Sequence, residues 1–457
     1  MTHSIGDVVA RGMCVGCGGC SIRTSGAIPV RLDRYGVYQA DLTSATAAQI
    51  EAANEICPFA DASKDEDRLA EERYGSLPSD GRIGRYRSVF AGRLADAGRS
   101  IDSSSGGLTS WFLGELLDRG VVDGVVHVGR TEGRELFGYT ISRSSEALFE
   151  SRKSMYYSTT LDEVVREVRG DGRRYAIVGV PCFITAMRHL EEVDVHLRDQ
   201  FTWHIGLVCG HLKSQFFAES LAWQAGVPPE DLEAIDFRVK NPARRSYSYD
   251  YEVRGRARGP RMRPTQAAID GNWGYGAFQP GACNFCDDVF AETADVVFGD
   301  AWLPKYTDDW LGMNVVVTRH ADADRILADG VRDSVIRLEE LTVEDAARSQ
   351  AGNFRHRRDG LRVRLADDLA AGLSVPRKRV DAGYEGISTQ RIALIRQRRA
   401  MSELSFTAFA EARASGRLSA YTRPMRAAIA RYRRVESAGK SLPTRARERL
   451  RSFLRRG

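Results

Sequence analysis

The chain has 457 residues, of which 43% are hydrophobic and 9% aromatic, and its formal net charge is +5. This length allows two or three domains with proper cores, and the composition is that of a soluble globular protein. No stretch reaches the roughly 18 to 20 apolar residues of a membrane span, and no apolar leader follows a basic start, so we expect a cytoplasmic protein.

The positive charge is concentrated at the C-terminus. Residues 421–457 contain eleven Arg, one Lys and two Glu, a net charge of +10, so residues 1–420 carry −5. Such a tail can bind nucleic acid, an acidic membrane surface or an acidic partner, or it can be a solvated helical appendage.

The first 75 residues are rich in turn formers and cysteine, and then strands and amphipathic helices alternate. We predict strands at 86–94, 121–129, 174–180 and 201–209, and helices at 107–120, 160–170, 183–193 and 214–226. This alternation indicates a parallel or mixed sheet in an α/β domain.

The pattern changes between residues 230 and 320, where helix is scarce. Strands are predicted at 234–241, 246–256, 294–302 and 313–320, which suggests an α+β portion built onto the first sheet. Helical patterns return at 321–372, and beyond Pro376 the chain is Arg-rich and helical, punctuated by Pro424 and Pro443.

Eight cysteines in a cytoplasmic chain indicate metal or redox chemistry, because cytosolic thiols are held reduced. Cys14, Cys17 and Cys20 follow one another at two-residue spacings, with glycines between them, and Cys57 precedes the only proline that directly follows a cysteine. Bacterial ferredoxins bind a 4Fe–4S cluster with this spacing and a Cys-Pro ligand. A zinc site or reactive thiols are the alternatives.

The other four cysteines are more scattered. Cys283 and Cys286 form one C-x2-C pair, whereas Cys182 and Cys209 each follow a predicted strand. Because the carboxyl ends of strands are where α/β proteins place their sites, these four are candidates for a second cluster. A zinc site and ordinary buried thiols remain open.

Three serines and two glycines, residues 103–107, stand directly before the helix predicted at 107–120. Hydroxyls, free backbone N–H groups and the helix dipole suit a phosphate or pyrophosphate. The alternative is a helix cap with a flexible turn.

Taken together, these segments resemble one family. "CVGCGGC", "CPF", "SSSGGLTSWFL", "VGVPCFITAMR", "GLVCGH", "CNFCDDVFAETADVVFGDAW" and "GMNVVVTR" occur in the order seen in the beta subunits of coenzyme F420 hydrogenase/dehydrogenase, over residues 10–320. The plant reductase of 7-hydroxymethyl chlorophyll a is related to this family. The resemblance implies FAD and one or two 4Fe–4S clusters.

The resemblance also implies roles for individual residues. It makes Cys14, Cys17, Cys20 and Cys57 ligands of one cluster, and Cys182, Cys209, Cys283 and Cys286 ligands of a second. The segment 151–158 matches approximately a family segment near the flavin. The implied cofactor-binding residues are Ser103, Ser104, Ser105, Gly106, Gly107, Lys153, Ser154, Tyr157, Ser158, Gly179, Pro181, Gly299, Asp300, Trp302 and Asn314.

The function implied is an oxidoreductase that passes electrons between 4Fe–4S clusters and an organic partner through FAD. That partner would be coenzyme F420 or a small or glycan-linked molecule, with a ferredoxin as a candidate redox partner. Candidates for proton delivery are Lys153, His204 and Asp300, with His211 beside them.

Two other functions stay open. The chain could be an electron-relay subunit that feeds a partner enzyme, with a link to exopolysaccharide synthesis, or a cluster-bearing nucleic-acid binder. We do not expect nucleic acid, because Tyr421, Tyr432 and Phe453 are the only aromatics in the basic segment 421–457. Residues 425–435 and 447–456 mix apolar and Arg positions at helical spacing, so a peripheral membrane contact is the more favoured role of the tail. A homo-oligomer is also compatible.

We therefore expect an α/β (α+β) protein of four parts. These are a ferredoxin-like iron–sulfur module at 1–75, an α/β flavin-binding domain at 83–212, an α+β domain at 213–375 that completes the flavin and second cluster sites, and a helical Arg-rich tail at 376–457.

Overall fold

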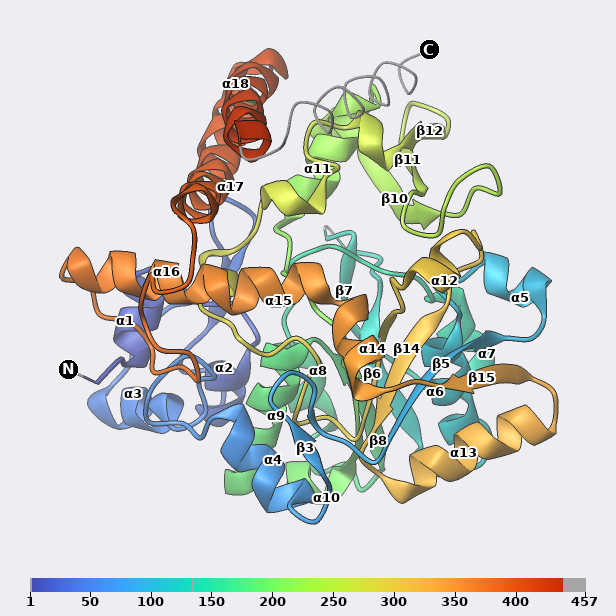
Figure 1. The fold of residues 1–457 in the computed structure, drawn as a ribbon. Helices are drawn as coiled ribbons and strands as arrows, with labels where there is room; N and C mark the ends of the chain where they lie inside the picture. The colour runs from blue at the N-terminus through green and yellow to red at the C-terminus, as the bar shows by residue number, and fades with distance from the viewer. Residues whose placement is uncertain (1, 134, 439–457) are drawn as a thin grey trace.

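The computed structural model describes residues 2–133 and 135–438. Its centre is an eight-stranded mixed sheet of strand order β15-β5-β14-β13-β9-β8-β6-β7 (Figure 1). The strands are β5 (Ser88–Leu94), β6 (Gly124–Arg130), β7 (Phe137–Ser142), β8 (Tyr175–Gly179), β9 (Phe201–Leu207), β13 (Val296–Asp300), β14 (Asn314–Thr318) and β15 (Ile336–Glu340). The inner strands β6, β8, β9 and β13 run parallel, which confirms the predicted mixed α/β class.

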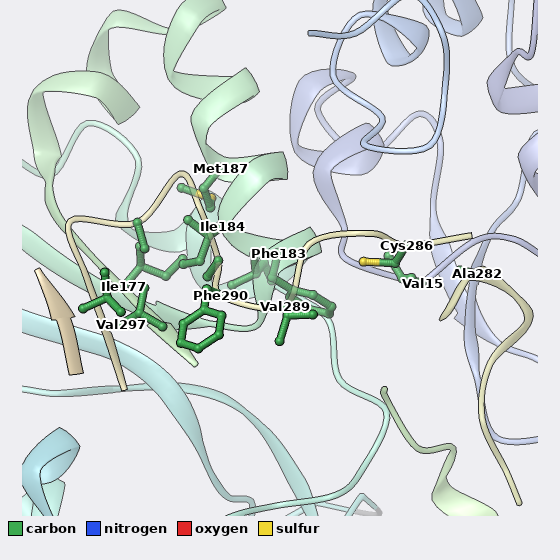
Figure 2. Close-up of a cluster of buried hydrophobic side chains, with 14 of the residues drawn as sticks. Val15, Ile177, Phe183, Ile184, Met187, Ala282, Cys286, Val289, Phe290 and Val297 are labelled. Carbon is green, nitrogen blue, oxygen red and sulfur yellow. The ribbon is translucent and has the colours of Figure 1, made fainter. Parts of the chain in front are cut away.

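Apolar runs form these strands because both faces of the sheet are covered. In β14, Val315 and Val317 pack into the cluster on one face, whereas Val316 packs into the cluster on the other. Helices α8 (Asp162–Val168) and α9 (Pro181–Val193) cover the first face, and α6 (Leu108–Asp118) and α13 (Ala321–Arg332) cover the second. Figure 2 shows residues of α9 packed against Ile177 and Val297 of the sheet.

The strand ends that can form a ligand site lie together at one side of the sheet, called the carboxyl edge below. The parallel strands β8, β9 and β13 end there, and β14 begins there, because Asn314 pairs with Asp300 in the antiparallel ladder. In α/β sheets ligands bind outside the carboxyl ends of the strands.

The N-terminal segment is built from short elements around its own small core. They are α1 (Ile5–Ala10), α2 (Gly19–Arg23), α3 (Ala47–Asn54), α4 (Glu66–Tyr74) and the strand pairs β1 (Val30–Leu32) with β2 (Tyr38–Ala40) and β3 (Ser79–Asp80) with β4 (Gly84–Arg85). Helix α2 packs against α8 and α9, and the N–H of Leu161 donates to the carbonyl of Cys17 at 3.0 Å. This segment is therefore docked on one face of the sheet.

A second layer stands above the carboxyl edge. It contains the antiparallel sheet β10 (Leu232–Val239), β11 (Asp250–Gly255) and β12 (Arg261–Pro264), helix α11 (Gln215–Gln224), and a long hairpin of α17 (Thr389–Ser415) and α18 (Ser419–Ala438). These elements share one aromatic core, which includes Phe216, Phe237, Phe278, Phe409 and Tyr421. Figure 1 shows the hairpin, in red, beside α11 and the other elements of this layer.

The remaining elements are short connections and covering helices: α5 (Ala97–Ile101), α7 (Ser145–Glu150), α10 (Val195–Gln200), α12 (Pro304–Thr307), α14 (Val343–Ser349), α15 (Ala351–Arg357), α16 (Asp359–Ala370), and the 3₁₀ turns at Pro229–Asp231, Thr265–Ala267, Trp273–Tyr275 and Gly281–Asn284.

The C-terminal tail differs from its prediction at one point. Pro424 does not end the helix. It lies inside α18, in the second turn, where it removes a single backbone donor. The apolar residues Met425, Ala428 and Ile429 of the segment 425–435 are buried and pack into the hydrophobic clusters of the second layer. Pro443, Phe453 and the amphipathic segment 447–456 lie outside the described residues. Within the described ranges, no helix combines the length and apolar character needed to cross a membrane.

Candidate functional site

A cavity of about 1820 Å3 opens at the carboxyl edge of the central sheet. Its floor consists of the ends of β8, β9 and β13, and its walls come from the second layer and α18. Twelve of the predicted cofactor-binding residues line it: Ser103, Ser104, Ser105, Gly107, Lys153, Ser154, Tyr157, Gly179, Gly299, Asp300, Trp302 and Asn314. Gly106, Ser158 and Pro181 lie next to lining residues but are not themselves part of the lining.

The serine–glycine loop is held in place by Asn314. Its side chain accepts from the N–H of Leu108 at 3.1 Å and donates to the carbonyl of Gly299 at 3.1 Å, which ties the start of α6 to the end of β13. A Cβ on Gly106 would lie 2.6 Å from the carbonyl oxygen of Gly92, and one on Gly107, where φ is +84°, would lie 2.7 Å from Leu94. The loop thus needs both glycines.

Gly107 of this loop is the N-cap residue of α6, but no serine of the loop caps the helix. The side chain that accepts from the first turn is that of Asn314, which bonds to the N–H of Leu108. The serines are engaged elsewhere: Ser105 donates to the carbonyl of Met313 at 3.0 Å, and Ser104 accepts from the N–H of Ser154 at 2.6 Å.

Basic side chains surround the loop. The amino group of Lys240 donates to the carbonyls of Ser100 and Ser105, both at 2.7 Å, and burial, with Arg238 nearby, lowers its pKa to about 7.

Two ion pairs lie close to the loop. Arg238 holds Asp300 through two hydrogen bonds of 3.0 and 3.2 Å. Lys153 has a positive φ of 106° and pairs with Asp236. Asp300 and Lys153 are therefore both committed to ion pairs.

The cavity is also lined by a buried lysine, Lys213, that no sequence pattern singles out. Lys213 is 1% exposed, donates to the carbonyl of Ala277, and lies over the rings of Phe217 and Trp273 at 4.7 and 4.5 Å. Burial lowers its pKa to about 7.

His211 stands beside that lysine. Its ring stacks on Trp273, with the ring centroids 4.5 Å apart, and burial lowers its pKa well below the usual range. Its Nε2 is buried without a hydrogen-bond partner among the described residues. A neutral imidazole with an unsatisfied nitrogen thus lines the cavity.

His204 lies away from the cavity. It is 0% exposed, its Nε2 bonds to Glu191 and its backbone N–H donates to Asp295, on the face of the sheet covered by α9. Its predicted role in proton delivery is not supported by this position, because His204 is not part of the cavity lining. The parity of its strand position turns it toward α9.

The first four cysteines converge at the start of α2. Cys20 lies within electrostatic range of Cys14, Cys17 and Cys57, and burial raises the pKa of Cys17 to about 12. The N–H groups of Gly16 and Ala40 both point at the sulfur of Cys14 at 3.4 Å.

The glycines between these cysteines are required by close contacts. A Cβ on Gly16, where φ is +68°, would lie 2.6 Å from the carbonyl of Tyr38. One on Gly18, where φ is +89°, would lie 2.7 Å from the N–H of Asp162. The loop therefore packs closely against β2 on one side and against the start of α8 on the other.

The second four cysteines also converge. Cys182, at the start of α9, lies within electrostatic range of Cys209, Cys283 and Cys286 and, across the interface, of Cys17. Cys209 lines the cavity. Cavity, second cysteine group and first cysteine group thus follow one another in space.

The second group has polar neighbours of its own. The N–H of Leu212 points at the sulfur of Cys283 at 3.3 Å, and Arg357 donates to the sulfur of Cys286 and, at 3.0 Å, to the carbonyl of Cys209. Figure 2 shows Cys286 beside Val15 of the N-terminal segment. Among residues 2–133 and 135–438, no three His, Cys, Asp or Glu side chains are arranged to hold a metal ion.

Comparison with known families gives two matches from one family. The C-terminal model of the coenzyme F420 hydrogenase/dehydrogenase beta subunit matches residues 172–344, and the N-terminal model of the same subunit matches residues 89–166. Together the two matches span more than half of the chain.

Individual proteins agree with this at low identity. The chain is 24% identical over 194 residues to a coenzyme F420-dependent sulfite reductase of Methanocaldococcus jannaschii, covering 42% of this chain and 28% of that protein. It is 24% identical over 217 residues to one of the subunits of the F(420)H(2) dehydrogenase of Methanosarcina mazei, covering 46% and 56%. The matches thus span about a quarter and about half of these relatives.

A solved structure shares the fold. A chain of the F420-reducing [NiFe] hydrogenase complex from Methanosarcina barkeri superposes with a TM-score of 0.50 at 15% identity, covering 66% of this chain and 99% of that one.

Proposed function

The chain belongs to the coenzyme F420 hydrogenase/dehydrogenase beta-subunit family, and we propose that it is a flavin and iron–sulfur oxidoreductase. FAD would occupy the cavity, with one 4Fe–4S cluster at each cysteine group. The observation that carries the proposal is the spatial order of cavity, Cys209, Cys182 and Cys17.

The residues of the cavity fit a flavin dinucleotide. Gly106 and Gly107 let the loop pack closely against β5, and the start of α6, whose Thr109 and Ser110 line the cavity, offers backbone donors to a pyrophosphate. His211 has a nitrogen left to bond. The volume of about 1820 Å3 exceeds the roughly 300–1,000 Å3 of ordinary ligand pockets, which supports room for a cofactor and an organic partner together.

The cysteine groups fit clusters better than single ions. A cluster spreads four thiolates over the corners of a cube, and backbone N–H groups around it stabilise its negative charge. Gly16, Ala40 and Leu212 supply such donors. Arg357 adds a cation beside the second group.

A bound flavin would exchange electron pairs with an organic molecule and single electrons with clusters. The residues of this chain would hold and shield that chemistry. Asn314 fixes the loop over the floor, Arg238 holds the side chain of Asp300 beside it, and Trp273 and Phe217 close the wall around Lys213. Lys213, with a pKa of about 7, is the group on this wall suited to hold or release a proton near neutral pH.

Anaerobic purification with iron, sulfide and flavin counts tests the proposal. We expect about eight irons and one FAD per chain, and bleaching of the flavin by reduced coenzyme F420 or by a reduced ferredoxin. About four irons would remove the second cluster, and zinc without flavin would overturn the proposal.

An electron-relay subunit without its own substrate is the second candidate. The names of the relatives favour it, since one is a subunit and another belongs to a complex. A flavin that is reduced by a ferredoxin but by no organic donor would select this function.

A further inference from the structure

One side of α18 forms the outer wall of the cavity. Its lining residues are Arg426, Ile429, Ala430, Arg433, Arg434 and Ser437, whose spacings of one, three and four residues place them along one face of the helix. Arg355 of α15 lines the same cavity. The family match ends at residue 344, so these arginines belong to a part of the chain that the family models do not include.

This wall is fixed by the core. Tyr421 of α18 is fully buried, stacks on Phe278 with ring centroids 5.4 Å apart, and donates to Asp270 at 3.1 Å. Arg433 donates to the hydroxyl of Tyr275 at 2.8 Å. The helix that carries these arginines is therefore fixed in the fold, and Arg433 is held by its own hydrogen bond.

These arginines are not neutralised by ion pairs in the part of the chain that the structure describes. Within residues 2–133 and 135–438, no carboxylate forms an ion pair with Arg355, Arg426, Arg433 or Arg434. Four cations lining one cavity favour an anionic ligand.

This cationic wall is distinct from the basic residues around the serine–glycine loop. Lys153, Arg238 and Lys240 gather at the carboxyl edge of the sheet, whereas the arginine wall belongs to the hairpin of the second layer. Trp273 and Tyr275 line the cavity as well. The basic residues of the cavity therefore come from two separate parts of the chain.

We propose that the arginine wall binds the anionic end of the organic partner, which identifies that partner as a molecule with at least two phosphoryl or carboxylate charges remote from its reacting ring. The inference rests on the proposed function, since it takes FAD as the occupant of the loop site. Planar guanidinium groups bind phosphate and carboxylate through paired hydrogen bonds. A deazaflavin with a phosphate-and-carboxylate chain and a nucleoside-diphosphate sugar both carry this chemistry.

The test compares two double variants of the same helix in the flavin-loaded protein. Arg426→Gln/Arg434→Gln removes two lining arginines, and Arg423→Gln/Arg431→Gln removes two exposed arginines that do not line the cavity. Inorganic pyrophosphate is titrated into each by calorimetry. Coenzyme F420 and a nucleoside-diphosphate sugar then compete for the site, which distinguishes the two sources.

We expect saturable pyrophosphate binding whose Kd rises about tenfold or more in the lining variant and stays unchanged in the matched control, since the lining variant loses two donors of charge-assisted hydrogen bonds. Displacement by one of the two competitors supports the substrate class. Equal binding by all three proteins, or displacement by neither competitor, overturns it. Loss of FAD from the lining variant also overturns it, because the arginines would then hold the cofactor. If wild-type protein carries no flavin, the proposed function has failed instead.

Discussion

The guanidinium of Arg357 donates a hydrogen bond to the sulfur of Cys286. Arg357 is 1% exposed and also donates to the carbonyls of Cys209 and Gly210, at 3.0 and 3.1 Å, so its charge is fixed against the second cysteine group from inside the protein. A buried cation beside a cluster stabilises the more negative, reduced form.

Replacing Arg357 with Met should therefore lower the midpoint potential of the cluster proposed at the second cysteine group. A charge-assisted hydrogen bond of about 1.5–3 kcal/mol corresponds to roughly 60–130 mV for a one-electron couple. Redox titration followed by electron paramagnetic resonance measures this shift. The first cluster is the internal control and should keep its potential, and Arg357→Lys should recover part of the shift. Equal shifts of both clusters would contradict the assignment.

The two cysteine groups should lose iron independently. Cys57→Ala removes a ligand of the first group only, and Cys182→Ala removes a ligand of the second only. Each variant should retain about four irons, because one cluster keeps its full set of thiolates. Only Cys182→Ala should disturb the flavin spectrum, since its group includes the cavity residue Cys209. Loss of all iron from both variants would indicate a single shared site.

Gly107 should tolerate no side chain. Gly107→Ala combines a φ of +84° with a Cβ 2.7 Å from Leu94 and 2.9 Å from Ser103, so we expect a loss of about 2–4 kcal/mol in the free energy of unfolding and weaker FAD retention. Gly120→Ala, at the other end of α6, is the matched control. Its φ is +64°, but nothing lies within 4 Å of an added Cβ, so it should lose only about 1 kcal/mol. Denaturant unfolding and flavin counts of the two variants check this.

The sequence was sufficient for six of the eight strands of the central sheet, β5, β6, β8, β9, β13 and β14, because their signals are local. Runs such as Val315–Val317 read as buried strands, and the alternation with amphipathic helices indicated a parallel or mixed sheet. The cysteine spacings and the serine–glycine loop also identified segments that the structure brings together at one edge. Strand β7 has no counterpart among the predicted strands, since its run of half-buried residues is a weak pattern. Strand β15 was also missed, because it is a short, mostly exposed edge strand between helices in the region 321–372 that was predicted to be helical.

The rest of the site depends on contacts between distant segments. Arg357 reaches Cys286 from 71 positions away, and Lys240 reaches Ser100 from 140. An arginine or lysine in a helical or strand pattern gives no sign that tertiary packing will bury it. His204 shows the converse, because its position three residues before the end of β9 was the available signal that it faces α9 rather than the edge.

Lys240 should make stability depend on pH in a defined direction. Its folded pKa is lowered to about 7 by burial, whereas an unfolded lysine titrates near its ordinary value of about 10.4. Between these values the unfolded chain binds more protons at this group, so the contribution of Lys240 to the free energy of unfolding rises with pH from about 7 to about 10 and is smallest below pH 7. Lys240→Met removes this dependence, so relative to wild type the variant should gain stability as pH falls through that window. Its two hydrogen bonds to the carbonyls of Ser100 and Ser105 are lost at every pH, which should lower FAD retention throughout.

Lys305→Met, at an exposed lysine paired with Glu339, is the control and should not show this rise. Chemical denaturation of the three proteins at several pH values measures the difference, and a pH-independent gap between Lys240→Met and wild type would show that Lys240 titrates normally in the folded protein.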